Sequence, residues 1–269
     1  MPSTLKLTCI FAHPDDEAMG MGGTLAKYAA EGIQIHLITA TRGERGWAGS
    51  PDKNPGLQGL GQIREAELRC AAARLGIHEV VFLDYIDGDL DQADSDEAVA
   101  RIVTHLRRIR PHVVVTFGPE GAYGHPDHIA ISQFTNAAVV CAADSAYSDV
   151  SHQAAHRVDK LYYMVDSWPL VEFVKEHLGG IQFEVDGIQR EHTGWPDWAI
   201  STHIESYAYW QTAVEAIACH QTQLTGMPGL LDMHFEEHQF VWCNGNFYRA
   251  FSLVNNGHRR ESDLFEGLR

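Results

Sequence analysis

The fold is decided by the first forty residues, which contain the stretches LKLTCIF (Leu5–Phe11), AMGMGGTLAKYAAE (Ala18–Glu31) and IQIHLITA (Ile33–Ala40). The first and third are apolar runs with β-branched residues, as is typical of buried strands. The second is rich in Ala, Leu, Met and Lys, which favour helix. A strand, a helix and a strand in this order predict a βαβ unit, whose parallel strands are joined by the helix.

The same alternation continues to about residue 117. A helix that ends at Gly76 is predicted by apolar residues at positions 68, 71, 72 and 75, and another by an apolar stripe between the capping-box-like Asp94 and Pro111. The runs at 80–83 and 113–117 indicate strands. We therefore expect an α/β, Rossmann-like fold: a mostly parallel sheet with helices on both faces and a smaller C-terminal elaboration. Because ligands bind beyond the carboxyl ends of such strands, the site should follow Phe11, Ala40, Leu83 and Phe117.

Beyond about Asp144 the pattern is weaker, but no linker-like composition separates this part of the chain. We expect one domain over residues 1–269, with an α/β core at 1–143 and a substrate-pocket elaboration at 144–269. The expected elements of the second part are strands at Lys160–Val165, Ile200–Ile204, Phe240–Trp242 and Tyr248–Leu253, a helix over Ser206–Gln221, and an irregular stretch from Ser167 to Trp198.

The composition excludes several classes of partner. The 269 residues include 20 Lys or Arg and 36 Asp or Glu, so the formal net charge is −16 with histidine neutral. This charge repels phosphate, so we expect a small-molecule partner and neither nucleic acid nor a membrane surface. No apolar stretch reaches the roughly 20 residues that cross a bilayer. We expect a soluble cytoplasmic protein and leave the oligomeric state open, a homo-oligomer included.

The cysteines support the same location. The five of them lie far apart, form no CxxC pair and are odd in number. We therefore expect neither a disulfide framework nor a cysteine zinc site, which suits a reducing compartment.

Two short motifs lie where the site is expected. His13-Pro14-Asp15-Asp16 follows the first strand, and His125-Pro126-Asp127-His128 follows the strand at 113–117. Each motif by itself is also typical of a turn that caps a helix. Both in these positions favour a metal site, because His13, Asp16 and a histidine of the second motif supply two imidazoles and a carboxylate, as catalytic zinc takes, with one position open for water. Asp15 is then free to act as a base, and Tyr123 to donate a hydrogen bond to an oxyanion.

These motifs carry a resemblance to a known family. AHPDDE (Ala12–Glu17), TRGE (Thr41–Glu44) and YGHPDH (Tyr123–His128) resemble the LmbE/PIG-L family of zinc-dependent N-deacetylases, which includes the mycothiol and bacillithiol pathway deacetylases. A fainter similarity lies at Ala216–Gln223, whereas Ser145–Trp198 matches nothing that can be aligned.

The resemblance implies a role for individual residues. It implies that His13, Asp16 and His128 bind Zn²⁺ and that Asp15 is the base. It further implies that His125 stabilises the transition state, that Tyr123 contacts the oxyanion and that Asp127 orients a histidine. Substrate-binding roles follow with less support for Arg64, Asp87 and His220, for which a solvated helix charge, a turn residue and a position on a helix face are the alternatives.

Two other functions compete with this one. His234-Phe235-Glu236-Glu237-His238 fits the H-x-x-E-H pattern of inverzincin peptidases, in which His234, Glu237 and His238 would act. That motif needs a helix and a third acidic ligand well downstream, yet few residues remain and the following residues indicate a strand. A non-catalytic metal- or sugar-binding module is the third possibility, which the spare Asp15 disfavours.

The resulting hypothesis is a metal-dependent N-deacetylase, a hydrolase of linear amide bonds. Its substrate would be an N-acetylglucosamine-type conjugate, and its metal Zn²⁺, although Fe²⁺ accepts the same ligands. The stretch 145–198 also contains Trp168, Trp195 and Trp198 beside the rigid Pro169 and Pro196. These tryptophans are predicted to form a rim over the metal that stacks on the substrate, with coverage of the core as the alternative.

Overall fold

The computed structural model describes residues 4–148, 152–185, 187–254, 257 and 259–269. The βαβ unit expected at the N-terminus is present: β1 (Lys6–Phe11) and β2 (Gln34–Thr41) pair in parallel and α1 (Asp16–Ala30) joins them. Both strands are almost entirely buried, as parallel strands covered on both faces are, and apolar residues predominate in them.

One seven-stranded sheet runs through the molecule in the order β10-β11-β5-β4-β1-β2-β3. The strands from β5 to β3 in this order are parallel, whereas β11 and β10 are antiparallel to their neighbours. The chain builds β1, β2 and β3 in one direction and then returns to place β4 and β5 on the other side of β1. The boundary between β1 and β4 is therefore the switch point of the sheet, where ligands bind in such folds. The remaining strands of the sheet are β3 (Glu79–Tyr85), β4 (Val113–Phe117), β5 (Lys160–Met164), β10 (Thr202–Glu205) and β11 (Asn244–Ser252).

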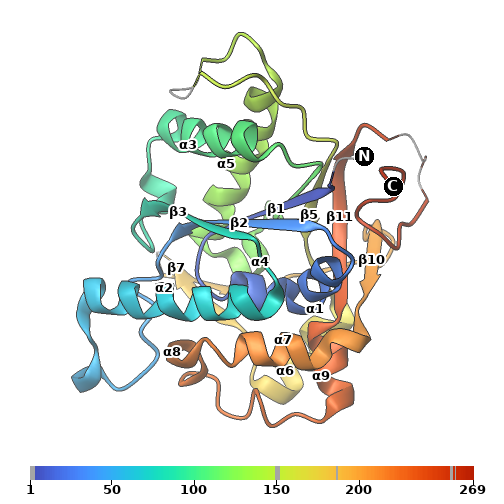
Figure 1. Cartoon of the computed structure of the whole chain (residues 1–269). Coiled ribbons are helices and arrows are strands. Elements are labelled where there is room, and N and C mark those ends of the chain that lie inside the picture. The colour runs from blue at the N-terminus through green and yellow to red at the C-terminus, as the bar shows by residue number, and fades with distance from the viewer. Residues whose placement is uncertain (1–3, 149–151, 186, 255–256, 258) are drawn as a thin grey trace.

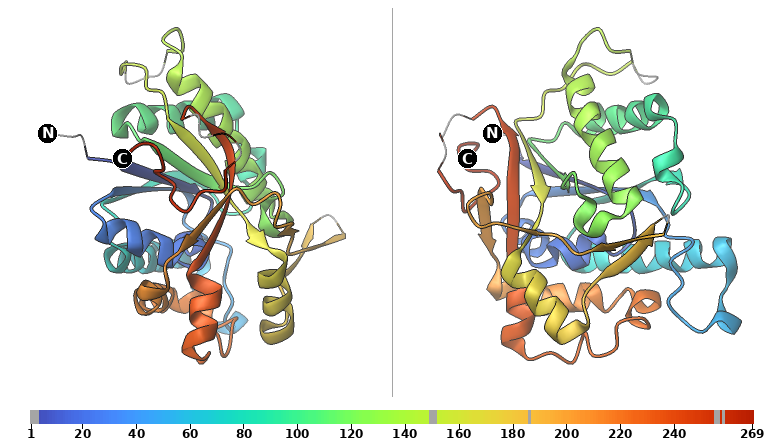
Figure 2. Two further views of the ribbon diagram at one scale, coloured as in Figure 1. Left: turned by 90° about the vertical axis from the view of Figure 1, so that its right-hand side faces the viewer. Right: turned by 180° about the vertical axis from the view of Figure 1, so that it is seen from behind.

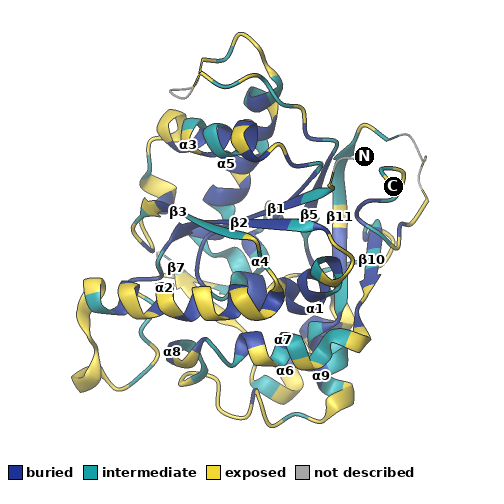
Figure 3. Ribbon diagram, in the orientation of Figure 1, coloured by how far each residue is buried: buried dark blue, intermediate teal, exposed yellow. Residues whose placement is uncertain are grey.

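Helices cover both faces of this sheet, so the expected α/β fold class is confirmed (Figure 1). One face carries α3 and α5 and the other carries α1 and α2, with α7 packed beneath α1 and α2. Figure 3 shows the buried strands between helices whose outward sides are exposed. The bounds of these helices are α2 (Gly56–Leu75), α3 (Ser95–Ile109), α4 (Gly121–Gly124), α5 (Pro126–Ala143) and α7 (Trp210–Ile217).

Local signals explain where two of these helices begin and end. The Asp94 carboxylate accepts a hydrogen bond of 2.9 Å from the Glu97 backbone N–H and so caps the start of α3. Gly76 ends α2 with φ of 72°, a left-handed conformation that a side chain would oppose.

The C-terminal part adds its strands to the same sheet and places further elements around the carboxyl ends of the strands (Figure 2). These are β6 (Asp166–Ser167), α6 (Trp168–Leu178), β7 (Gln182–Val185), β8 (Ile188–Glu191), β9 (Gly194–Trp195), α8 (Gln221–Leu224) and α9 (Phe235–Trp242). A small apolar cluster of Leu170, Val174 and Val241 joins α6 to α9. The division into one domain with a core at 1–143 stays a prediction.

Two expectations for this part are wrong. The stretch 167–198 is not irregular throughout, because it contains α6 and the β7–β8 hairpin. Its signals were present: Pro169 in the first turn, apolar residues at 170, 174 and 178, and Gly179 at the end with φ of 81°. The strand expected at 240–242 is the last turn of α9, and β11 begins only at Asn244.

Within the residues that the structure describes, no helix combines the length and apolar character needed to cross a bilayer.

Candidate metal centre and active site

Three side chains meet at the switch point. His13 follows β1, Asp16 begins α1, and His128 lies in the first turn of α5. His13 Nδ1 lies 3.2 Å from His128 Nε2 and 3.9 Å from Asp16 Oδ2, and His128 Nε2 lies 3.6 Å from Asp16 Oδ1. Ligand atoms around a tetrahedral zinc, at bonds of 2.0–2.1 Å, are roughly 3.4 Å apart. His13, Asp16 and His128, called the triad below, therefore have the chemistry and the spacing of a metal site.

The other ring nitrogen of His13 is held by two carboxylates. His13 Nε2 lies 3.2 Å from Asp127 Oδ2 and 3.1 Å from Asp87 Oδ1. Asp127 is fully buried and accepts hydrogen bonds from the backbone N–H groups of Gly88 and Leu90. A metal-ligating histidine commonly has such a carboxylate partner, which fixes its tautomer.

The charges around His13 favour a cation at this point. Burial lowers the pKa of His13, but its bonds to Asp127 and Asp87 outweigh burial and raise that pKa to about 10. Burial raises the pKa of Asp16 to about 7, although the nearby His13 opposes this rise.

A second group of donors exists nearby, formed by His13, His125 and Asp127. It shares His13 with the first group, but Asp127 is completely buried and already bonded to two backbone amides. Asp16 and His128 instead line a cavity that a substrate can enter. The first group is therefore the one that is accessible for catalysis.

Asp15 adopts a backbone conformation that few residues tolerate. Its φ of 114° is positive, which costs a residue with a side chain on the order of 1–3 kcal/mol and is common at functional sites. Arg64 Nη2 donates to Asp15 Oδ2 at 3.1 Å and to the Pro14 carbonyl at 2.5 Å, and the Asp15 N–H donates to Glu17 Oε2 at 3.0 Å. Burial raises the pKa of Asp15, although Arg64 opposes this. Asp15 lines the same cavity as Asp16 and His128.

The three residues expected to bind substrate lie behind this site. Arg64 is buried against Asp15 and the Gly43 carbonyl, and Asp87 is buried against His13 and the Arg45 N–H. Gly43 in the TRGE motif is required here, because a Cβ on it would lie 2.2 Å from the Arg64 guanidinium. None of Arg64, Asp87 and His220 is among the residues that line the cavity. In this structure Arg64 contacts Asp15, Asp87 contacts His13, and His220 contacts Glu17.

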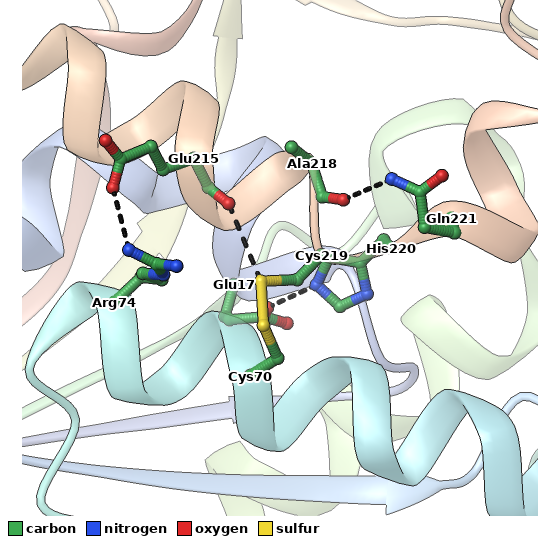
Figure 4. Close-up of a disulfide and its surroundings, with 8 residues drawn as sticks. All are labelled: Glu17, Cys70, Arg74, Glu215, Ala218, Cys219, His220 and Gln221. Carbon is green, nitrogen blue, oxygen red and sulfur yellow. Dashed lines mark hydrogen bonds and ion pairs between the residues drawn. A yellow bond between two sulfur atoms is a disulfide. The ribbon is translucent and has the colours of Figure 1, made fainter.

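His220 lies between α7 and α8, fully buried, with Nε2 2.8 Å from Glu17 Oε1 (Figure 4). Burial lowers its pKa, but the neighbouring Glu17 outweighs burial and raises it. Glu17 thus connects His220 to the Asp15 backbone, a role that was not anticipated although Glu17 stands in the AHPDDE motif.

The expectation about cysteines needs a correction. Cys70 of α2 and Cys219 form a disulfide with Cα atoms 5.9 Å apart, next to His220 (Figure 4). Their separation of 149 residues gave no sequence signal for the pair. The argument from free cysteines to a reducing compartment therefore fails.

Tyr123 and His125 lie on the segment between β4 and α5. The Tyr123 ring contacts His128 edge-on with centroids 5.2 Å apart, and it lines the cavity. Burial and the carboxylates of Asp16 and Asp15 raise the pKa of Tyr123, so its hydroxyl stays protonated and can donate. Burial and the proximity of His13 lower the pKa of His125 to about 4, so this imidazole is neutral at pH 7. Its Nδ1 accepts a hydrogen bond of 3.2 Å from the Asp127 N–H.

The cavity itself has a volume of about 580 Å³. From the metal triad it extends toward β5, α6 and α9. Its wall there is mostly apolar, with Leu170, Val174 and Trp242 among its members, and it also contains Asp166 and His192, which sequence reasoning missed.

The tryptophans considered as a rim are elsewhere. Trp195 Nε1 donates to Glu120 at 2.9 Å, and its ring packs on Tyr248. Trp198 is 85% exposed and lines a different cavity. Neither belongs to the wall of the active-site cavity.

The peptidase motif lies at the start of a helix, so the strand predicted directly after it is wrong. Its side chains nevertheless stabilise the fold. The Glu237 carboxylate accepts a hydrogen bond of 2.7 Å from the His234 N–H at the start of α9. His238 is buried, stacks on Trp210, and accepts a hydrogen bond from Trp242. In the described part of the chain, no group of potential metal ligands forms around these residues.

Comparison with known proteins identifies the family of the chain. The family model described as PIG-L, GlcNAc-PI de-N-acetylase, matches residues 8–139. The chain is 35% identical to a 1D-myo-inositol 2-acetamido-2-deoxy-alpha-D-glucopyranoside deacetylase of Rhodococcus jostii over 99% of both chains, and 29% identical to a mycothiol S-conjugate amidase of Streptomyces coelicolor over 100% of this chain and 99% of the relative. The structure of an N,N'-diacetylchitobiose deacetylase from Pyrococcus horikoshii has the same fold, with a TM-score of 0.67, 20% identity, and coverage of 91% of this chain and 83% of that one. The chain therefore belongs to the PIG-L family of amide hydrolases.

Proposed function

We propose that this protein is a zinc-dependent deacetylase that removes the N-acetyl group from an N-acetylglucosamine-type conjugate. The observation that carries the proposal is that one cavity of about 580 Å³ is lined by Asp16 and His128 of the triad together with Asp15 and Tyr123. A substrate amide in this cavity can therefore reach the metal ligands, a base and a hydrogen-bond donor at once. The Rhodococcus jostii relative, whose name gives an acetamido sugar as its substrate, supports the substrate class.

The ligands would be His13, Asp16 and His128. When bound, a divalent zinc ion polarises a carbonyl group and lowers the pKa of a water molecule toward about 7. Fe²⁺ accepts the same donors, so the choice of zinc over iron rests on the preference of zinc for two imidazoles and a carboxylate with an open position.

The side chains of the cavity supply the rest of the reaction. Asp15 takes the proton of the attacking water and then gives it to the leaving amine, so one carboxylate serves as base and acid. The Tyr123 hydroxyl donates to the acetyl oxygen as negative charge develops there, with the neutral His125 beside it. Asp127 and Asp87 orient His13, while Arg64 and the Glu17–His220 pair fix Asp15.

The partner is a small molecule in this proposal. The net charge of −16 supports the absence of a nucleic-acid partner, while a cytoplasmic location and a homo-oligomer stay predictions from the sequence.

The test is a panel of N-acetylated sugars assayed for released amine with metal-free and zinc-loaded protein. The proposal expects turnover that depends on zinc and is largest for N-acetylglucosamine conjugates. Release of amine by metal-free protein would refute the proposal. The absence of amine release from every acetamido sugar would refute it as well.

A further inference from the structure

The part of the cavity formed by residues 144–269 contains one pair of charged side chains that the reaction does not use. Asp166 and His192 both line the cavity that contains Asp15 and His128. His192 Nε2 lies 2.6 Å from Asp166 Oδ2. The pair comes from the segment whose role the sequence left open.

The backbone brings Asp166 to the substrate side of the sheet. It follows β5, which pairs in parallel with β4 up to Met164 opposite Phe117, and Phe117 is a wall of the cavity. Asp166 also pairs with Gly194 of β9, so its main chain is fixed on both sides. The position is therefore at the carboxyl edge of the sheet, one strand beyond the metal triad.

The two members of the pair differ in exposure. The His192 side chain is only 8% exposed, and its Nδ1 is buried without a hydrogen-bond partner among the described residues. The Asp166 side chain is 32% exposed. The imidazole therefore holds one carboxylate oxygen of Asp166 through its Nε2, and Asp166 itself lines the cavity.

A carboxylate held in this way accepts hydrogen bonds from hydroxyl groups. Most cavity residues contributed by 144–269 are apolar, with Leu170, Val174 and Trp242 among them. Of the polar members that the structure describes there, Asp166 alone has a carboxylate, so it is a fixed anionic acceptor on this wall. We propose that Asp166, positioned by His192, binds a hydroxyl group of the polyhydroxylated moiety attached to the N-acetylated sugar. The inference rests on the proposed function and assigns the aglycone specificity to this pair.

Four substrates test this, assayed as released amine with the zinc-loaded full chain. N-acetylglucosamine has no aglycone, and its phenyl glycoside has an aglycone without hydroxyl groups. Its inositol glycoside and N,N'-diacetylchitobiose carry polyhydroxylated groups. Asp166→Ala should raise KM about tenfold or more for the last two, the scale of a lost hydrogen bond to a charged group, with kcat within twofold. KM for the first two should stay within twofold.

Variants of His192 separate positioning from structure. His192→Ala should raise KM for the same two substrates by a smaller factor, and His192→Gln, which keeps an N–H donor, should restore most of the loss. Asp166→Leu, which has a similar side-chain shape and no acceptor, repeats the test if the alanine variant folds poorly. His36→Gln is the matched control, because His36 pairs with Glu79 at 3.0 Å outside the cavity and should leave every KM unchanged.

The outcomes are distinct. Equal KM changes on all four substrates, no change on any, or a His192→Gln that behaves as His192→Ala would overturn the role of the pair while the deacetylase proposal stands. If zinc-loaded wild-type protein releases amine from none of the four, the proposed function fails and this inference fails with it.

Discussion

The two halves of the chain hold their polar groups around the cavity in different ways. In residues 1–143 the charged side chains near the triad are buried and bonded to one another, as His13 is to Asp87 and Asp127. In residues 144–269 the wall is mostly apolar and its Asp166 is a third exposed. The polar side chains of the first half are preorganised and have little conformational freedom, whereas the second half presents an accessible surface to the substrate. Substitutions in the first half should therefore change kcat, and those in the second should change KM.

The largest effect should come from the metal ligands of the first half. His13→Ala, Asp16→Ala and His128→Ala should each abolish stoichiometric zinc, measured by metal analysis, and reduce amine release to background. His234→Ala and His238→Ala serve as controls and should retain zinc and activity. Full zinc occupancy in any of the three ligand variants would remove that residue from the set.

Asp15→Asn should give the next largest effect. The amide has nearly the shape of the carboxylate but cannot take a proton, so kcat should fall by on the order of 10² or more while zinc stays bound. Zinc content and kcat measured on the same preparation check this. Wild-type kcat in this variant would show that Asp15 is not the base.

Arg64→Lys sharpens the comparison, because the sequence suggested a substrate contact and the structure shows a buried contact with Asp15. Lysine keeps the charge but cannot reproduce the bonds to Asp15, Pro14 and Gly43. We expect kcat to fall roughly tenfold with KM nearly constant, on the scale of one lost charged hydrogen bond. A rise in KM with constant kcat would instead return Arg64 to the substrate-binding residues.

The disulfide should affect catalysis least. Cys70→Ser opens a link between positions 149 residues apart, which should lower the free energy of unfolding by about 2–4 kcal/mol. Chemical denaturation measures this, and kcat should stay within twofold because Glu67 still accepts hydrogen bonds from the Thr222 N–H and hydroxyl. A large loss of kcat at full folding would mean that the disulfide itself positions His220.

The sequence predicted the first half better than the second for a physical reason. The proposed ligands His13, Asp16 and His128 belong to short motifs at strand ends, so the rule for parallel sheets was enough to predict that they lie together. The pair of Asp166 and His192 could not be predicted, because the residues are 26 positions apart and meet through the pairing of β6 with β9. For Arg64 the sequence likewise predicted a substrate contact, with a solvated helix charge as the alternative, and neither includes its buried contact with Asp15 and Gly43.

Other errors came from signals that were present but weak. The Trp and Pro residues of 167–198 favoured an irregular stretch, although the apolar spacing there is that of α6. The apolar residues at 240–242 favoured a strand, but they form the last turn of α9. Tertiary packing of α6 against α9 decides both elements, since their apolar residues form one cluster.

The central claim is that the metal lies among His13, Asp16 and His128 at the boundary between β1 and β4. Anomalous diffraction from zinc-loaded crystals at the zinc absorption edge tests it most directly. The account predicts one strong peak at roughly 2.0–2.2 Å from His13 Nδ1, His128 Nε2 and an Asp16 carboxylate oxygen. A peak bound by His125 and Asp127, or one near His234 and His238, would contradict it.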